Sequence, residues 1–252
     1  MPTFLSDGIQ LAYDVFGAGE PVLLIHGFAS NTQINWVSTG WVDTLTKAGY
    51  RAIAFDNRGH GRSQKLYDPN LYFAHEMAAD AARLLDHLEI AAPVPVIGYS
   101  MGARIAAFLC LNAPERVRCA VLGGMGTNLV TGLADSEEII AALTADTLAE
   151  VRGRSGRQFR IFAEHSGADR AALAACMISS REPMAEADVR RIATPVLVAV
   201  GAEDEMAGSA QALASLFPHG EAFTIPRRDH MRATGDFAFK EAALDFLARQ
   251  RG

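Results

Sequence analysis

The segment from Gly98 to Gly102 is the part of this sequence best suited to chemistry. It spells G-x-S-x-G, a pattern typical of a tight strand-to-helix turn that lifts a serine hydroxyl above the end of a sheet. The turn needs glycines because a Cβ there would collide with neighbouring backbone. An apolar run from Val94 to Ile97 precedes it and a helix-like run from Ala103 to Leu111 follows. Ser100 is therefore a candidate nucleophile.

Polar residues also follow the other apolar runs of strand length. Because the carboxyl ends of parallel strands meet at one edge of a sheet, residues directly after each strand are expected to lie together. Along the chain they come in the order serine, acid, histidine. The segments are His26-Gly27-Phe28, Asp56 to Ser63, the turn around Ser100, Gly201 to Asp204, and Pro226 to His230.

Strands and helices alternate along most of the chain, which predicts a mainly parallel sheet covered on both faces. Asp7-Gly8 predicts a hairpin at one edge. Strands are expected at Thr3–Leu5, Ile9–Phe16, Pro21–Ile25, Arg51–Phe55, Val94–Tyr99, Val117–Gly123, Pro195–Val200 and Glu221–Ile225. Helices are expected at Trp41–Ala48, Ala74–Leu88, Ala103–Leu111 and Phe237–Leu247.

The pattern changes between residues 127 and 194, which are rich in alanine and charge and show no convincing strand. Helices are expected there at Ser136–Leu143, Gln158–Glu164 and Arg170–Ile178. We interpret this stretch as a helical cap inserted over one end of the sheet. The core domain would then comprise residues 1–126 and 195–252, with the cap at 127–194.

The bulk properties exclude several classes of function. Of 252 residues, 50% are hydrophobic and 21% charged, the net charge is −6, and no cluster of lysine and arginine occurs. Nucleic acid is therefore not an expected partner, and no apolar run is long enough to predict stable membrane insertion. Cys110, Cys119 and Cys176 lie far apart in apolar surroundings, which favours reduced, buried thiols in a cytoplasmic protein. No glycine-rich loop has the spacing of a phosphate-binding motif.

Taken together, the H-G-F segment, the D-x-R-G-H-G-x-S loop at 56–63, the G-x-S-x-G turn, an aspartate after the penultimate strand and a late Asp-His pair resemble the α/β-hydrolase fold superfamily. Within it, the chain is similar to small, capped, esterase-like serine hydrolases. The resemblance implies an α/β fold with a mainly parallel, doubly wound sheet and a small helical cap. It also implies no cofactor, no metal, and a small ester substrate with an apolar acyl or alcohol part.

The resemblance assigns a role to each residue of the site. Ser100 would be the nucleophile, His230 the base that activates it, and Asp204 the acid that orients the imidazole. The backbone N–H groups of Phe28 and Met101 would form the oxyanion hole.

Several alternatives accompany these assignments. Glu203 is the second candidate for the acid. His26 and His60 are expected to be structural, as is the loop carrying Asp56, Arg58 and Ser63. Many relatives have a proline shortly after the acid, whereas this chain has Met206-Ala207-Gly208. Four large residues near the catalytic loops are expected either to line the substrate pocket or to pack in the core: Trp36, Met125, Met206 and Met231.

A serine in the turn narrows the chemistry. Haloalkane dehalogenases and epoxide hydrolases of this superfamily use a carboxylate nucleophile, so the serine argues against both. It suits acyl transfer to water, and the leading expectation is hydrolysis of small carboxylic esters through an acyl-enzyme. A thioesterase, a lactonase or a C–C bond hydrolase would use the same triad. A ligand receptor with the triad retained and slow turnover is the alternative from another class.

Overall fold

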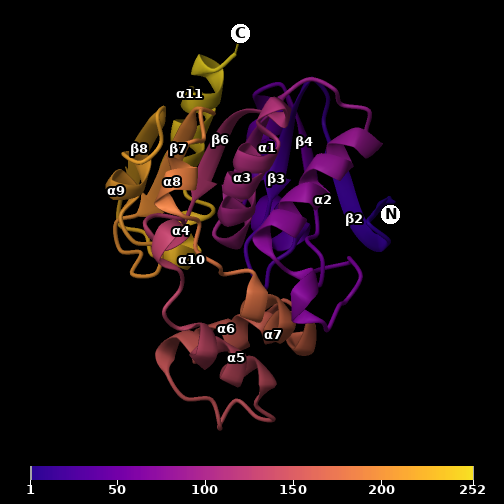
Figure 1. Ribbon diagram of the computed structural model, residues 1–252, viewed down its shortest axis with the longest axis vertical. Coiled ribbons are helices and arrows are strands. Elements are labelled where there is room, and N and C mark those ends of the chain that lie inside the picture. The colour runs from indigo at the N-terminus through magenta and orange to yellow at the C-terminus, as the bar shows by residue number, and fades with distance from the viewer. Residues whose placement is uncertain (1, 252) are drawn as a thin grey trace.

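The computed structural model describes residues 2–251 and places eight strands in one sheet. Their order across the sheet is β1-β2-β4-β3-β5-β6-β7-β8 (Figure 1). Strand β2 runs antiparallel to both β1 and β4, and the remaining described pairs are parallel. The bounds are β1 Thr3–Ser6, β2 Ile9–Phe16, β3 Glu20–Ile25, β4 Tyr50–Phe55, β5 Val94–Tyr99, β6 Val117–Gly123, β7 Val196–Gly201 and β8 Gly220–Ile225.

The predicted helices are present with small shifts at their ends, α6 beginning at Arg154 instead of Gln158. The α-helices are α1 Trp41–Lys47, α2 Ala74–His87, α3 Met101–Asn112, α4 Asn128–Thr131, α5 Ser136–Thr144, α6 Arg154–His165, α7 Arg170–Ser179, α8 Glu186–Val189, α9 Ala210–Ala214, α10 His230–Ala233 and α11 Phe237–Arg249. A π-helix spans Gln33–Val37, and 3-10 helices span Pro69–Leu71 and Pro114–Arg116.

The central strands β3 to β7 are buried on both faces, which confirms the doubly wound architecture. Strand β3 shows the reason, since successive side chains of a strand point to opposite faces. Leu23 and Ile25 join the apolar cluster that includes residues of α2 and α3, whereas Val22 and Leu24 join the cluster with α1 and α11. A strand packed on both sides needs an unbroken apolar sequence, as β3 has.

The hairpin predicted at Asp7-Gly8 is confirmed, and the start of β5 accommodates a proline. Asp7 and Gly8 have φ values of 50° and 77°, the left-handed backbone of a tight hairpin turn between β1 and β2. Pro95 lies at the start of β5, where the pairing with β6 shifts register between Val94 and Pro95. That irregularity accommodates a residue with no N–H to donate.

The segment between β6 and β7 is helical, and residues 124–195 contain no strand. Figure 1 shows α5, α6 and α7 grouped beyond one end of the sheet, while α4 and α8 lie beside the main body. The three outer helices are what we call the cap. The exact division of the chain into core and cap at 127 and 194 stays a prediction.

Arg104 connects both ends of this insertion to the helix that follows Ser100. Its guanidinium is buried and donates to the backbone oxygens of Asn128 and Leu129, on the way into the cap, and to that of Glu182, on the way out, at 2.7–3.0 Å. Charged donors to buried carbonyls are among the stronger hydrogen bonds in proteins. The position of the cap therefore depends on α3.

The three cysteines are buried and form no disulfide, as predicted. Among the helices of residues 2–251, none combines the length and the apolar character required to cross a lipid bilayer.

Replacing Arg104 with methionine should destabilise the protein, because it removes the buried, charged donor that links α3 to the backbone oxygens of Asn128, Leu129 and Glu182. We expect a loss of about 2–4 kcal/mol in the free energy of unfolding, measured by urea titration, together with faster proteolysis near residues 127–133. Arg190→Met is the control, since Arg190 makes only an exposed ion pair with Glu186. Equal stability of the two variants would contradict the role assigned to Arg104.

Candidate active site

Ser100 occupies the strained turn between β5 and α3. Its φ of 53° is rare for a residue with a side chain. The turn is tight on both sides: a Cβ on Gly98 would lie 2.3 Å from the carbonyl oxygen of Gly102, and one on Gly102 would lie 1.9 Å from that of Ile25. These contacts press the turn against the end of β3. The observed geometry is that of the predicted strand-to-helix turn.

Ser100, His230 and Asp204 form a continuous chain of hydrogen-bonding groups. The Nε2 atom of His230 lies 3.0 Å from the Ser100 hydroxyl oxygen, and its Nδ1 lies 2.7 Å from Oδ2 of Asp204. Since a carboxylate only accepts, Nδ1 carries the hydrogen and Nε2 is free to accept the proton of Ser100. Residues 130 positions apart in sequence are thus placed for nucleophilic catalysis.

Asp204 is held as a buried carboxylate by its surroundings. Burial alone raises the pKa of its carboxyl, but the hydrogen bond from His230 and those from the N–H groups of Met206 and Ala207 outweigh burial and lower that pKa. The Asp204 side chain is fully buried, whereas Glu203 is exposed. Of the two acids considered from the sequence, the structure brings Asp204 to His230.

The backbone N–H groups of Phe28 and Met101 are free of protein acceptors. Within residues 2–251, neither donates a hydrogen bond to another protein group. The loop at Gly27 lies close to Ser100, because a Cβ on Gly27 would be 3.5 Å from the Ser100 Cβ. Two unpaired donors beside a nucleophile are the arrangement that an oxyanion hole requires.

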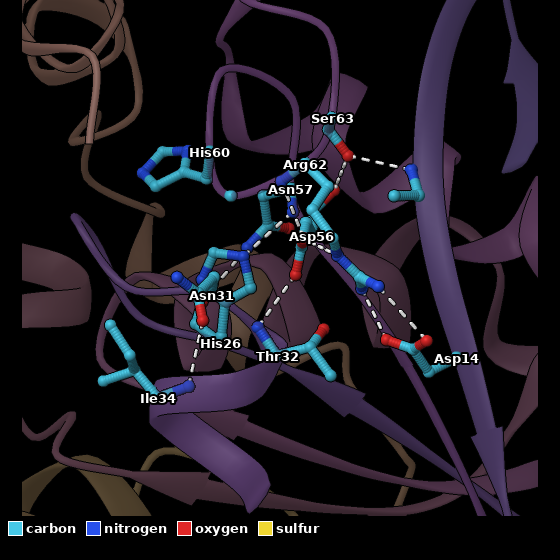
Figure 2. A network of polar contacts seen from close by, with 12 residues as sticks. Asp14, His26, Asn31, Thr32, Ile34, Asp56, Asn57, His60, Arg62 and Ser63 are labelled. Carbon is cyan, nitrogen blue, oxygen red and sulfur yellow. Dashed lines mark hydrogen bonds and ion pairs between the residues drawn. The ribbon is translucent and has the colours of Figure 1, made fainter. Parts of the chain in front are cut away.

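His26 holds the loop that carries the Phe28 N–H. Its Nδ1 lies 2.7 Å from the Gly27 carbonyl oxygen and must donate, while its Nε2 accepts from the backbone N–H of Asn57 at 2.9 Å (Figure 2). Burial lowers the pKa of His26, which keeps the imidazole in the neutral form that this bonding needs. His26 therefore fixes this loop through its two hydrogen bonds, which is the structural role predicted for it.

The loop at 56–63 is braced in the same way (Figure 2). Asp56 accepts from the backbone N–H of Thr32 at 2.8 Å and from the backbone and side chain of Arg62 at 2.9 Å. Burial by itself raises the pKa of Asp56, but these hydrogen bonds outweigh burial and that pKa is lowered to about 2. His60 donates from Nδ1 to the Arg58 carbonyl oxygen, and burial lowers its pKa to about 3. Neither histidine reaches Ser100 through a hydrogen bond.

A small cavity of about 100 Å³ lies directly beside Ser100. Its walls are mainly apolar, and Met231 is one of the lining residues. Met206 lines a second, larger cavity that also borders His230. Trp36 and Met125 line neither cavity; Trp36 packs edge-on against Trp41 in the core, and Met125 is buried in the other apolar cluster. Core packing, one of the two predicted roles, is where the structure places them.

Sequence reasoning missed the residues that the cap contributes. Phe159 and Phe162 of α6 line the small cavity, and the ring of Phe159 meets that of Phe28 edge-on at 5.7 Å. Their spacing of three residues puts both on one face of α6 and was the available signal. Tyr99 was missed too: its hydroxyl donates to the backbone oxygen of His230 at 2.5 Å and fixes the start of α10.

The described residues contain no group of three or more histidine, cysteine and acidic side chains arranged to hold a metal ion.

Comparison with known proteins agrees with this geometry. A family model described as the alpha/beta hydrolase fold matches residues 20–160. BpoC of Mycobacterium tuberculosis, which carries the name of a non-heme bromoperoxidase, is 43% identical over 114 residues, 45% of this chain and 41% of that protein. Epoxide hydrolase 2 of Siraitia grosvenorii is 37% identical over 122 residues, 47% of this chain and 36% of that protein. The aligned part thus spans about two fifths of these relatives' length.

Solved structures extend the similarity over the whole fold. The crystal structure of a hydrolase from Pseudomonas aeruginosa PA01 matches with a TM-score of 0.79 at 25% identity, covering 98% of this chain and 97% of that one. The chain belongs to the α/β-hydrolase fold family, as the sequence motifs predicted.

Gly102→Ala should disrupt the site, because the added Cβ would meet the backbone oxygen of Ile25 and push the turn off β3. We expect little soluble protein, or at least about a 100-fold loss of activity in whatever folds. Gly235→Ala is the matched control, since its Cβ would come no closer than 3.3 Å to Thr39. Full activity of Gly102→Ala would contradict the tight packing described here.

Asp56 should contribute stability that depends on pH. Folding lowers its pKa from 3.8 to about 2, so its contribution is complete above about pH 5 and is lost as the pH falls toward 2. The shift corresponds to about 2 kcal/mol. The difference in unfolding free energy between the wild type and Asp56→Asn, measured in urea at pH 7, 4 and 3, should shrink over this range. A difference that does not change with pH would rule out the contribution.

Proposed function

We propose that this protein is a serine hydrolase that cleaves small carboxylic esters through an acyl-enzyme intermediate. The observation that carries the proposal is the Ser100–His230–Asp204 chain, with distances of 3.0 and 2.7 Å, beside two free backbone donors. These contacts allow a two-step mechanism of acylation and deacylation.

In the acylation step, the Ser100 oxygen attacks the ester carbonyl carbon while His230 takes the hydroxyl proton at Nε2. The negative charge that develops on the carbonyl oxygen is stabilised by the N–H groups of Phe28 and Met101. The intermediate collapses when His230 returns the proton to the leaving alcohol oxygen. Asp204 stabilises the imidazolium that exists between the two transfers, without itself becoming protonated.

In the deacylation step, a water molecule loses a proton to His230 and attacks the Ser100 ester. The same two backbone donors stabilise the second oxyanion. Collapse returns the proton to the serine oxygen and releases the carboxylic acid, so the enzyme ends in its starting state.

Ser100 also indicates which of the relatives' activities, epoxide hydrolysis or haloperoxidation, this chain could share. Hydrolysis of an epoxide by the family's carboxylate route needs an acid where this chain has Ser100, so the epoxide hydrolase similarity does not transfer. The haloperoxidase similarity suggests a second candidate that shares the acyl-enzyme. Hydrogen peroxide in place of water would release a peracid, which could then oxidise bromide. Bromination that requires both Ser100 and a carboxylic acid would identify that activity.

Two substitutions test the triad. Ser100→Ala should abolish turnover of p-nitrophenyl acetate and labelling by a fluorophosphonate, and Asp204→Asn should lower kcat by about 10⁴-fold, as in other triads. Glu203→Gln is the matched control and should retain most of the turnover of this ester. If Asp204→Asn stays active while Glu203→Gln is inactive, the acid is assigned wrongly. Labelling of Ser100 with no turnover on any ester would favour the receptor alternative.

The pH dependence tests the base. Because a protonated imidazole cannot accept the Ser100 proton, kcat/KM for p-nitrophenyl acetate should fall on acidification. A rate that stays constant between about pH 5 and pH 8 would contradict a histidine base.

A further inference from the structure

Two cavities of different size and character border the catalytic histidine. The small cavity has a volume of about 100 Å³ and the larger one about 760 Å³. Among residues 2–251, His230 is the only one that lines both, and Ser100 lines only the small one. Because Ser100 lines only the small cavity, the acyl and alcohol parts of an ester are expected to occupy different cavities.

The small cavity fits a short acyl chain. Ser100 and Phe28 lie in its wall, so the carbonyl carbon and its oxyanion would form there. Its apolar walls come from Phe28, Ile34, Phe159, Phe162 and Met231. An apolar cavity of about 150 Å³ suffices for benzene, so about 100 Å³ leaves room for an acyl chain of roughly two to four carbons.

The large cavity has a polar and predominantly acidic lining. Four of its residues are acidic and one is basic: Asp135, Glu203, Glu205, Asp229 and Arg154. Arg154 pairs with Glu205 at 3.5 Å, and Asp135 accepts from Ser155 at 2.7 Å. Asp229 lies 3.7 Å from the Arg232 guanidinium. Within residues 2–251, the carboxylate of Glu203 has neither an ion pair nor a hydrogen bond. The excess of carboxylates gives this cavity a negative potential, which disfavours anions.

The reaction itself connects the large cavity with the leaving group. His230 must deliver a proton to the leaving oxygen, so that oxygen lies on the imidazole side of the reacting carbon. The large polar cavity also borders His230. We propose that the large cavity is the alcohol subsite, and that the substrates are short-chain acyl esters of bulky polar alcohols, uncharged or cationic. This inference rests on the proposed esterase function.

Two series of esters test the proposal on the wild-type protein. Among p-nitrophenyl esters, kcat/KM should be at least about tenfold higher for the acetate and butyrate than for the octanoate. Among acetate esters, those of choline and glycerol should exceed that of glycolate by about tenfold, after each rate is divided by the rate of alkaline hydrolysis. This normalisation removes the intrinsic difference between leaving groups.

Substitutions in each cavity should move only the matching series. Phe162→Ala should raise the octanoate-to-acetate ratio severalfold by enlarging the small cavity. Glu203→Gln should lower the choline-to-glycolate ratio about two- to fivefold. Glu186→Gln is the control for charge, because Glu186 is an exposed carboxylate on α8 that lines neither cavity, and both ratios should match those of the wild type.

The outcomes separate the two proposals. If Ser100-dependent hydrolysis is observed but octanoate is cleaved as fast as acetate, or glycolate as fast as choline, the subsite assignment is wrong and the esterase function stands. If no ester is hydrolysed in a Ser100-dependent manner, the proposed function fails and the subsite assignment fails with it.

Discussion

The contact between Gly102 and the end of β3 is the constraint on which the site depends. The backbone of Gly102 lies where a Cβ would be 1.9 Å from the Ile25 oxygen and 2.7 Å from that of His26. This approach lets the first turn of α3 sit directly against the loop that carries the Phe28 N–H. The Met101 N–H lies at the start of α3, whereas the Phe28 N–H lies in the loop after β3. The contact at Gly102 fixes the distance between these two donors. A larger residue at 102 would separate Ser100 from the Phe28 N–H, one of the two donors of the proposed oxyanion hole.

Buried hydrogen bonds also fix the loop at Gly27 and the backbone of His230. The loop at Gly27 is fixed by His26 and by Asn35, whose side-chain oxygen accepts the Gly27 N–H at 3.0 Å. The backbone of His230 is fixed by Tyr99, the residue next to the nucleophile. These braces matter because preorganised donors stabilise a developing charge without any cost of reorganisation. These hydrogen bonds would therefore contribute to catalysis by the proposed triad as well as to stability.

The sequence was informative where local rules decide the structure. The turn at Ser100 needs glycines, parallel strands need apolar runs, and polar residues collect at strand ends, so the sheet and the candidate triad residues could be predicted. The pocket could not. Nearness to Ser100, Asp204 or His230 in sequence did not distinguish Met231, which faces the small cavity, from Trp36, which packs in the core. The spacing of Phe159 and Phe162 puts both on one face of α6. They reach the site only because the cap folds back over it, a tertiary effect that the spacing alone does not predict.

The loop after Asp204 shows how a departure from the family pattern fits this chain. The sequence has Met206-Ala207-Gly208 where many relatives carry a proline, and the N–H groups of Met206 and Ala207 both donate to Asp204 at 3.0 Å. A proline at either position would remove one of these donors.

The same loop also binds the entry to the cap. The backbone oxygen of Ala207 accepts from the N–H groups of Gly126 and Asn128, and the Asn128 side chain donates to the Met206 oxygen at 2.8 Å. Asn128 is in turn held through its backbone oxygen by Arg104 of the nucleophile helix. Any displacement of the cap entry thus acts on the acid loop and on α3 together. Asn128 is thus the residue through which the cap entry, the loop after Asp204 and α3 are joined by hydrogen bonds.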